Sequence, residues 1–228
     1  MKNVRNFFIL AVVFFCVGIP FALDIPTYLK MKNGDIVNLD EVEAFALERG
    51  DVVEGNVNYV LGCCAEEYTT NFGIRTSDRS DKLYYVIWLN NDNFIVYCTS
   101  SSSDYTKLDQ ITEETYAYLE SQATYDETND YEDLQLPATE LKIQGTVSKL
   151  PSNIEGFFRE WYQEAVGEEY GSFDECCEPL MITHARLGNL KTTIMIGAIF
   201  AAAGVLMLIL GIIFAIRNKI ASRNAMNW

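Results

Sequence analysis

The sequence predicts an α+β fold: an extracytoplasmic antiparallel or mixed sheet with two or three helices, flanked by two transmembrane helices. Apolar residues alternate with polar ones in several short runs between residues 52 and 185, which is the spacing of half-buried strands. Stretches with helical spacing interrupt these runs in a mixed order, unlike the regular alternation of βαβ units. A long uncharged apolar run lies near each end of the chain.

The C-terminal apolar run is the clearer of the two. Residues 193–216 are 24 residues without a charge, and Arg217, Lys219 and Arg223 follow them. A helix needs about 20 apolar residues to cross the hydrocarbon core of a bilayer. Residues 193–216 are therefore predicted to form a transmembrane helix, which makes the lipid bilayer a partner of this chain.

The N-terminal run allows two interpretations. Lys2 and Arg5 precede 16 uncharged residues at positions 7–22, a length between that of a membrane span and that of a signal-peptide core. A cleavable signal ends in small residues, and here Ala22 lies between two bulky residues. We therefore favour an uncleaved transmembrane helix over residues 7–23, and a cleaved signal peptide is the alternative.

Basic residues next to the apolar runs predict the topology. Lys and Arg close to a span favour the cytoplasmic side, and both terminal flanks are basic. We expect cytoplasmic tails at residues 1–6 and 217–228 and an extracytoplasmic domain over residues 24–192. The expected location is the cell membrane, with two passes and the central domain outside.

The central segment is acidic and rich in aromatic residues. Residues 24–192 hold all 32 acidic residues and 12 of the 17 basic ones, a formal charge of −20. Such a surface repels nucleic acid, so no nucleic-acid partner is expected. The segment also holds all 13 tyrosines, which is more aromatic material than a disordered acidic loop contains. It therefore predicts one packed domain.

The first part of this domain is predicted to open with an extended segment at residues 23–37, with a turn at Gly34. A helix capped by Asn38 is expected over residues 39–49, because its apolar residues share one face. The period then changes to two, which predicts a long strand or a hairpin-forming pair over residues 52–70.

The middle of the domain is predicted to contain an exposed loop at residues 71–81 and then a hairpin. Its strands cover residues 82–89 and 93–99, and Asn and Asp residues between them tolerate the turn. A short helix over residues 113–121, capped by Thr112, should follow. The acidic stretch at residues 124–136 is interpreted as a loop.

The last part is predicted to contain a strand, a helix and a final strand. Residues 139–150 alternate, with Gly145 at a bend or bulge. A helix should begin at Pro151 and Ser152 and end before Gly167, and four residues share one of its faces: Phe158, Trp161, Tyr162 and Ala165. The final strand is predicted over residues 178–185.

Several of these segments together resemble a known family. They are DVVEGNVNYVLGCCAEEY at residues 51–68, YYVIWLNNDNFIVY at 84–97, LKIQGTVSKL at 141–150 and FFREWY at 157–162. The chain resembles a family of uncharacterised two-span membrane proteins of Gram-positive, largely clostridial, bacteria. That family is a domain of unknown function. The resemblance implies the arrangement of span, domain and span, and it implies no active-site residues.

Cysteines suggest the sharpest chemical hypothesis. Five of the six lie in the predicted external domain, where thiols can be oxidised: Cys63, Cys64, Cys98, Cys176 and Cys177. One or two disulfides, for example between the first long strand and the region before the last strand, are one interpretation. Free or buried thiols are the other. A zinc site is disfavoured because adjacent cysteines lack the usual ligand spacing.

No catalytic, cofactor or metal site is predicted. His184 is the single histidine, so it cannot complete the common zinc triads, and the sequence identifies no partner for a Ser-His-Asp set. The acidic residues at 126–133 lack the pattern of a calcium loop and are interpreted as a solvated surface. Pairs of carboxylates carry no specificity among 32 acidic residues.

Small residues recur along the two predicted spans. In the second span they follow a seven-residue period, and in the first they have similar spacing; the set is Ala11, Gly18, Ala22, Gly197, Ala201, Gly204 and Gly211. Small residues let helix backbones approach closely in lipid. We therefore predict a packing seam between the spans, within one chain or between two chains.

The leading functional hypothesis is a non-enzymatic, membrane-anchored extracytoplasmic domain that binds a protein or another envelope component, either on its own or as a subunit of a larger membrane assembly. The sequence does not identify this ligand. An envelope hydrolase that uses carboxylates and a thiol-redox protein that uses Cys63 and Cys64 are the alternatives. A concave pocket with converging polar side chains would favour an enzyme, whereas exposed thiols of depressed pKa would favour the redox role.

Overall fold

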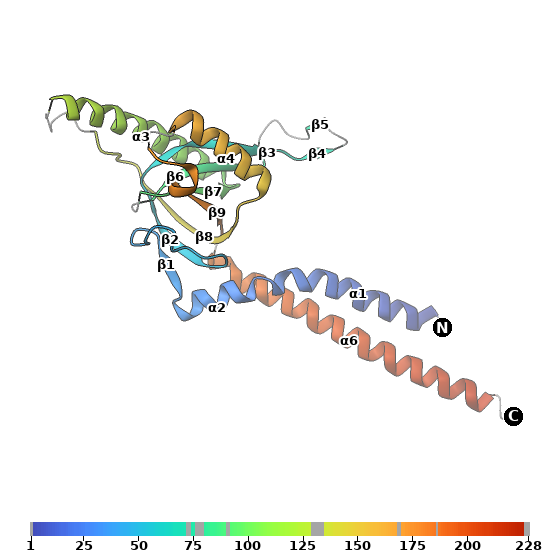
Figure 1. The fold of residues 1–228 in the computed structure, drawn as a ribbon. Coiled ribbons are helices and arrows are strands. Elements are labelled where there is room, and N and C mark those ends of the chain that lie inside the picture. The colour runs from blue at the N-terminus through green and yellow to red at the C-terminus, as the bar shows by residue number, and fades with distance from the viewer. Residues whose placement is uncertain are drawn as a thin grey trace. The chain divides into compact units, whose positions relative to one another are not determined.

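The computed structural model describes residues 2–71, 74–75, 80–89, 92–128, 135–167, 170–185 and 187–225. The chain forms two compact units. The helical unit consists of Met1–Lys32 and Leu187–Trp228, and the sheet unit consists of Asn33–Arg186. Figure 1 shows the elements of both units along the chain.

The helical unit contains α1 (Lys2–Ala22), α2 (Ile25–Asn33) and α6 (Leu187–Ala225). Helix α2 corrects the expectation of an extended segment at residues 23–37. The backbone N–H of Tyr28 donates to Asp24, and Pro26 lies in the first turn, where a missing N–H is tolerated. Gly34, with φ of 80°, ends the helix, and the expected turn lies there.

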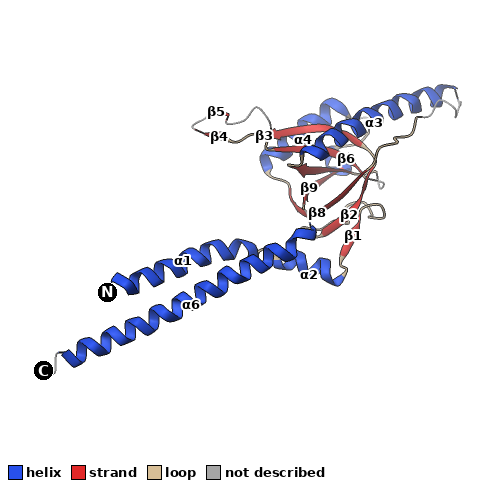
Figure 2. Cartoon of the chain, turned by 180° about the vertical axis from the view of Figure 1, so that it is seen from behind, coloured by secondary structure: helices blue, strands red, loops and turns tan. Residues whose placement is uncertain are grey.

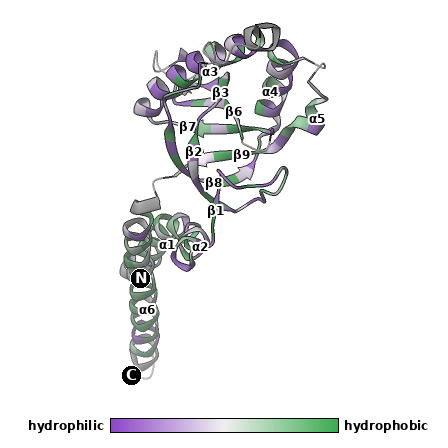
Figure 3. Ribbon diagram, turned by 90° about the vertical axis from the view of Figure 1, so that its left-hand side faces the viewer, coloured by the Kyte–Doolittle hydropathy of each residue, from purple (hydrophilic) through white to green (hydrophobic). Residues whose placement is uncertain are grey.

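Two helices of the described residues are long and apolar enough to cross a membrane. They run over Val4–Asn33 and Leu190–Ser222 and are compatible with a two-pass membrane protein. Figure 3 shows the hydrophobic colouring along α1 and α6. Their large side chains stay exposed: Ile199 is 66% exposed and Val12 is 59% exposed. In water such surfaces would associate.

Helices α1 and α6 lie side by side (Figures 1 and 2). Phenylalanines of α1 pack against glycine positions of α6, which we call the glycine notches. A Cβ added at Gly197 would lie 2.4 Å from Phe21 Cβ. A Cβ added at Gly204 would lie 3.2 Å from the Phe15 ring. A Cβ added at Gly211, the third notch, would lie 3.3 Å from Phe7 Cβ.

The remaining small residues of the expected seam divide into contacting and exposed ones. A Cβ added at Gly18 would meet the Gly197 carbonyl and the Ala201 N–H group, both at 3.2 Å. Ala11 is 1% exposed. Ala22, in contrast, is exposed at the end of α1. The contacts lie within one chain.

The sheet unit contains a seven-stranded mixed sheet in the order β1-β2-β8-β9-β7-β6-β3. Its strands are β1 (Ile36–Asn38), β2 (Val52–Val57), β3 (Val60–Glu67), β6 (Lys82–Trp88), β7 (Phe94–Thr99), β8 (Leu141–Lys149) and β9 (Cys177–His184). The pairs β1/β2 and β7/β9 are parallel, and the other neighbours are antiparallel. Strands β4 (Thr70–Asn71) and β5 (Ile74–Arg75) form a separate antiparallel pair. The predicted α+β class with a mixed sheet is confirmed.

Two predicted strand regions agree closely with the structure. The hairpin is β6 and β7, and Tyr84 lies opposite Cys98 in its register. Asp92 in the turn has φ of 64°, as expected for an Asp that tolerates the left-handed region. Strand β8 follows the alternation predicted for residues 139–150, and a Cβ at Gly145 would lie 2.6 Å from the Thr183 carbonyl oxygen.

The prediction of a hairpin-forming pair over residues 52–70 was wrong. Strand β2 pairs with β1 and β8, whereas β3 pairs with β6 at the opposite edge of the sheet. The alternation of apolar residues reports which face of a strand is buried, and it does not report the partner strand.

The predicted helix over residues 39–49 was also wrong, because this segment is an irregular loop. Leu39 and Leu47 are buried, and Phe45 is exposed with φ of 56°. The Asn38 side chain accepts from Asp40 N–H at 3.1 Å, and the Leu39 N–H donates to Glu54 of β2. The segment therefore hydrogen-bonds to the sheet and buries Leu39 and Leu47, so tertiary contacts override its helical pattern.

Helix α3 (Ser102–Thr128) is longer than the predicted helix over residues 113–121. It begins at Ser102, three residues after the end of β7 at Thr99. Of the loops expected at 71–81 and 124–136, residues 72–73, 76–79 and 129–134 lie outside the described residues. Residues 124–128 are helical, which corrects part of the second loop.

Helix α4 (Ser152–Ala165) confirms the helix predicted near residues 151–165. Gly167, with φ of 77°, follows its end, as the prediction required. The short helix α5 (Phe173–Cys176) was not predicted. Ser172 and Glu175 form a capping box at its start.

The sheet is covered on both faces. On one face Leu108 and Ile111 of α3 join the loop at residues 39–47, and on the other Phe158 and Tyr162 of α4 are buried. Helix α3 also follows the edge strand β3, where Val60 N–H donates to Thr115 Oγ1 at 3.1 Å. Figure 2 shows α3 and α4 with the sheet. This arrangement covers an edge that would otherwise expose unpaired backbone groups.

Candidate functional site

An aromatic pocket lies where α3, α4 and the sheet meet. It has a volume of about 140 Å³. We call it the aromatic pocket, and its lining is Leu61, Trp88, Phe94, Tyr116, Leu119, Trp161, Ala165, Val166 and Tyr170.

The floor and the rim of the aromatic pocket differ in exposure. Phe94 and Leu61 are 3% and 7% exposed, whereas Tyr116 and Tyr170 are 45% and 49% exposed. Large aromatic side chains at an open rim provide contact area with few rotatable bonds. The pocket is therefore open to a binding partner and rigid at its base.

Ring contacts hold the aromatic side chains in place. The Phe94 ring centroid lies 6.1 Å from that of Trp88, 6.0 Å from that of Tyr162 and 5.7 Å from that of Tyr170. The Tyr116 hydroxyl donates to the Leu61 carbonyl at 2.9 Å, which fixes α3 against β3. Such tilted aromatic pairs stabilise a preformed shape.

The helices beside the aromatic pocket are strongly acidic. Helix α3 carries seven acidic residues and one lysine, and α4 carries three acidic residues and one arginine. That arginine, Arg159, lies 2.7 Å from Asp174 and 3.3 Å from Glu155. Burial raises the pKa of Tyr170, and the charge of Asp92 adds to this effect. The field around the pocket is therefore negative.

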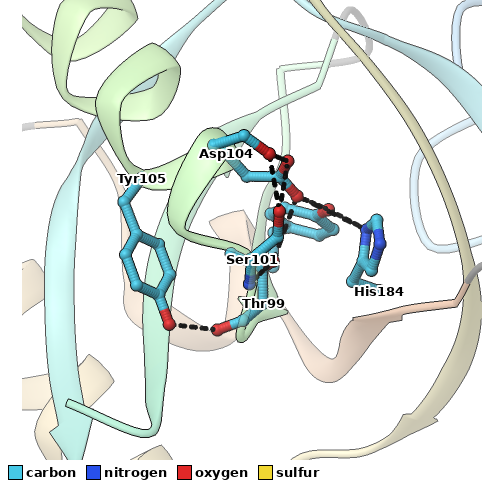
Figure 4. Close-up of polar contacts among 7 residues, drawn as sticks. Thr99, Ser101, Asp104, Tyr105 and His184 are labelled. Atoms are coloured by element: carbon cyan, nitrogen blue, oxygen red, sulfur yellow. Dashed lines mark hydrogen bonds and ion pairs between the residues drawn. The ribbon is translucent and has the colours of Figure 1, made fainter.

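A second candidate is a polar cluster around Asp104 at the start of α3 (Figure 4). The Asp104 carboxylate accepts hydrogen bonds from Thr99 Oγ1 at 3.1 Å, from Ser101 Oγ at 3.0 Å and from Ser103 Oγ at 3.3 Å. It is 9% exposed. A carboxylate in the first turn of a helix, with hydroxyl donors around it, stabilises that terminus.

His184 joins this cluster from the end of β9. The Tyr97 hydroxyl lies 2.8 Å from His184 Nδ1 and 3.4 Å from Asp104 Oδ2. Asp104 Oδ2 is 3.5 Å from the same histidine nitrogen. Burial raises the pKa of Tyr97, and the neighbouring Asp104 carboxylate adds to this shift. Tyr97 thus keeps its proton and serves as a donor.

These contacts correct the expectation that His184 has no identifiable partner. Tyr97, Asp104 and His184 come from three separate elements, so no local motif could reveal them. The arrangement is still not a catalytic triad. In a triad the serine hydroxyl hydrogen-bonds to the histidine. Here the Ser101 hydroxyl donates to Asp104 instead. His184 Nε2 is buried and has no hydrogen-bond partner among the described residues.

A polar groove lies at the β1 edge of the sheet. Its volume is about 420 Å³, and its lining is Ile36, Asn38, Asp40, Glu54, Gly55, Asn56 and Lys142. Its charged groups already bond one another: Lys142 lies 3.1 Å from Glu54, and Asp40 accepts from Asn56 N–H at 3.1 Å. Hydrogen bonds from Gln144 and from Lys142 lower the pKa of Glu54. The charged side chains of the groove therefore bond to neighbouring groups of the groove and do not converge on a common point.

The cysteines are free thiols in the structure. Strands β3 and β9 are separated by β6 and β7, which places them about 14 Å apart. A disulfide requires Cα atoms within about 7 Å, so one joining Cys63 or Cys64 to Cys177 does not fit this sheet.

The thiols also lack the properties of a redox pair. Burial raises the pKa of Cys63, and it raises that of Cys64 to about 12. Burial likewise raises the pKa of Cys98 and Cys177. The reactive thiolate is therefore disfavoured. Among the described residues, no group of three or more His, Cys, Asp or Glu side chains could hold a metal ion.

The structure defines a protein in which two candidate membrane helices flank an α+β sheet domain. The chain belongs to the family of the domain of unknown function DUF8577, whose model matches residues 3–217. Neither a curated protein nor a solved structure matches the chain.

Proposed function

We propose that this protein is a membrane-anchored binding domain whose aromatic pocket receives one apolar side chain of a protein partner. The observation that carries the proposal is the pocket itself, with a buried aromatic floor, an exposed aromatic rim and a volume of about 140 Å³.

The size of the aromatic pocket favours a protein partner over a small molecule. Sites for small molecules usually enclose about 300–1,000 Å³. A pocket of about 140 Å³ holds about one large side chain. Interfaces between proteins concentrate their binding energy on such buried anchors, with Trp and Tyr enriched around them.

Charge specifies the chemistry of the partner. The acidic residues of α3 and α4 favour a partner with Lys and Arg around its apolar anchor, because opposite charges speed the encounter. The same field disfavours nucleic acid. The partner is thus a basic protein segment that carries an apolar side chain.

The cellular arrangement follows from the two candidate spans. Basic residues at both ends support cytoplasmic tails, with α1 and α6 in the membrane and the sheet unit outside. The sequence resemblance supports a Gram-positive cell membrane. In this location the partner is another membrane or envelope protein, and the chain acts as a subunit of their assembly.

The two alternative functions receive no support from these surfaces. Among the residues that the structure describes, no carboxylate lines the aromatic pocket, and the carboxylates of the polar groove pair with Lys142 and backbone N–H groups. A carboxylate hydrolase therefore lacks a prepared site. The redox role requires thiolates, which the raised pKa values of Cys63 and Cys64 disfavour.

Photocrosslinking in cells tests the proposal. A photoreactive amino acid at Tyr116, on the exposed rim, should capture a discrete protein partner. The substitution Ala165→Trp fills the pocket from an exposed position and should reduce capture at least about tenfold. The matched control is Gln163→Trp, because Gln163 is exposed and lies two residues before Ala165, about 200° around the helix. Equal capture in both variants would contradict the proposal.

A further inference from the structure

The short helix α2 has a composition unlike that of the sheet unit that follows it. Its nine residues, Ile25–Asn33, include Lys30 and Lys32 and no acidic residue. Ile25 and Leu29 are 40% and 48% exposed, and Leu23 just before the helix is 75% exposed. The exposed surface of α2 therefore combines apolar side chains with positive charge.

The length of α1 determines where α2 begins relative to a bilayer. At a rise of about 1.5 Å per residue, the 16 uncharged residues 7–22 of α1 extend about 24 Å, somewhat less than a hydrocarbon core of about 30 Å. After α1, a turn at Leu23 and Asp24 separates the two helices. Helix α2 thus starts close to the end of the hydrocarbon.

Helix α2 is poorly suited to continue the span. If it did, Lys30 and Lys32 would enter the hydrocarbon, where a charged group is strongly disfavoured. If it lay wholly in water, Leu23, Ile25 and Leu29 would stay exposed. At the interface both groups find a favourable environment, with apolar side chains at the acyl boundary and ammonium groups among the headgroups.

The spacing of the exposed residues on α2 fits this orientation. Ile25 and Leu29 are four residues apart and lie on the same side of the helix. Lys32 lies beside them and is exposed, so its long side chain can extend toward the headgroups. Tyr28 is half-buried on the neighbouring side, and tyrosine is enriched at the membrane interface.

The charges near α2 in the helical unit are compatible with a negatively charged lipid surface. By the proposed topology, three of the unit's eight basic residues, Lys30, Lys32 and Lys191, lie on the outer side, and Asp24 is the unit's single acidic residue. Phosphate headgroups of anionic lipids complement these basic residues.

We infer that α2 is an interfacial anchor that lies in the membrane surface and binds anionic phospholipid headgroups through Lys30 and Lys32. This role does not depend on the aromatic pocket or on the partner proposed above. It fixes the first connection between the membrane and the sheet unit at the lipid surface.

A depth measurement on the full-length protein tests this inference. An environment-sensitive fluorescent amino acid replaces Leu29, and the protein is reconstituted in phosphatidylcholine vesicles with or without phosphatidylglycerol. Quenching by a lipid-attached quencher should exceed quenching by aqueous iodide at least about threefold. Phosphatidylglycerol should increase the lipid quenching.

Charge variants distinguish anionic-lipid binding from simple partitioning. The double variant Lys30→Gln/Lys32→Gln should lose the response to phosphatidylglycerol, whereas Lys107→Gln, an exposed change in the sheet unit, should keep it. Stronger quenching by iodide at position 29 would overturn the interfacial location. An unchanged response in the double variant would overturn the headgroup contact.

Discussion

The two units of this chain differ in net charge and in whether they bury or expose their large apolar side chains. The helical unit has eight basic residues and one acidic residue, a formal charge of +7, whereas the sheet unit has nine and 31, a charge of −22. The helical unit exposes large apolar side chains, and the sheet unit buries them, as at Val86 and Ile95 with 0% exposure. The difference teaches that the two units expose opposite kinds of surface, one apolar and basic and the other polar and acidic.

The forces that hold the two units also differ. Burial of apolar surface from water stabilises the sheet unit. In lipid that driving force is absent between helices, so close packing has to replace it. The glycine notches that receive Phe7, Phe15 and Phe21 provide that packing in the helical unit. Substitutions of similar size should therefore affect the two units by different mechanisms.

The largest effect is expected from Phe158→Ala in the sheet unit. Phe158 is 0% exposed, and its ring centroid lies 4.9 Å from that of Phe173. The substitution should reduce the free energy of unfolding by about 3–5 kcal/mol. Phe157→Ala is the matched control, because Phe157 is 51% exposed on the same helix and should cost less than about 0.5 kcal/mol. Chemical denaturation followed by circular dichroism measures both, and equal losses would contradict the assignment of the buried face.

The next effect concerns the helical unit. Gly204→Ile should weaken the contact of α1 with α6 by about 1 kcal/mol or more, because the Phe15 ring is already 3.2 Å from a Cβ at this position. Insertion should not change. Crosslinking between cysteines that replace Phe7 and Phe214, whose ring centroids are 5.3 Å apart, reports the contact. Val205→Ile, on the exposed side of α6, is the control. An equal fall in crosslinking yield in this variant would contradict the packing of Phe15 against Gly204.

A smaller effect is expected from His184→Ala. The variant removes the Tyr97 contact, but Tyr97 retains Asp104 as an acceptor, so the loss of unfolding free energy should be about 1 kcal/mol. Capture of the partner at Tyr116 should stay at the wild-type level. A large loss of capture with unchanged stability would instead assign a functional role to the histidine cluster.

The smallest effect is a pH dependence at Glu114. Hydrogen bonds from the hydroxyl and N–H of Thr139, with further ones from Gln110 and Ala138, lower the pKa of Glu114 to about 2. Because the folded-state pKa lies below the unfolded value of 4.5, this carboxylate stabilises the fold above about pH 4.5 and stops doing so as the pH falls through about 2.

Unfolding of a Glu114→Gln variant measures that pH dependence. The wild type should be more stable than the variant at about pH 6, and the difference should shrink toward about pH 2. Glu113→Gln, an exposed neighbour, should show no such convergence. A difference that stays constant with pH would show that Glu114 contributes through packing alone.

Sequence periodicity predicted those elements whose stability is local. The β6/β7 hairpin consists of two continuous aromatic and β-branched runs, and helix α4 has a strong apolar period that begins after Pro151. The loop at residues 39–47 has a helical apolar period, yet Leu39 and Leu47 are buried in the core of the sheet unit without forming a helix. Local pattern alone does not distinguish these cases.

The candidate site was predictable only in part. The periodicity of α4 placed Trp161 and Ala165 on one face, but Trp88, Phe94 and Tyr170 reach the aromatic pocket from distant parts of the chain. Their convergence depends on strand order, which the sequence pattern does not report. The contact of Tyr97 with His184 spans 87 residues and depends on the same strand order.

The most direct test of the account is the side of the membrane on which each unit's exposed lysines lie. A membrane-impermeant amine reagent on intact cells should label Lys107 and Lys142, which are exposed on the sheet unit, and label Lys219 only after permeabilisation. This result would agree with an external binding domain anchored by two spans. Labelling of Lys219 in intact cells, with Lys107 and Lys142 protected, would contradict it.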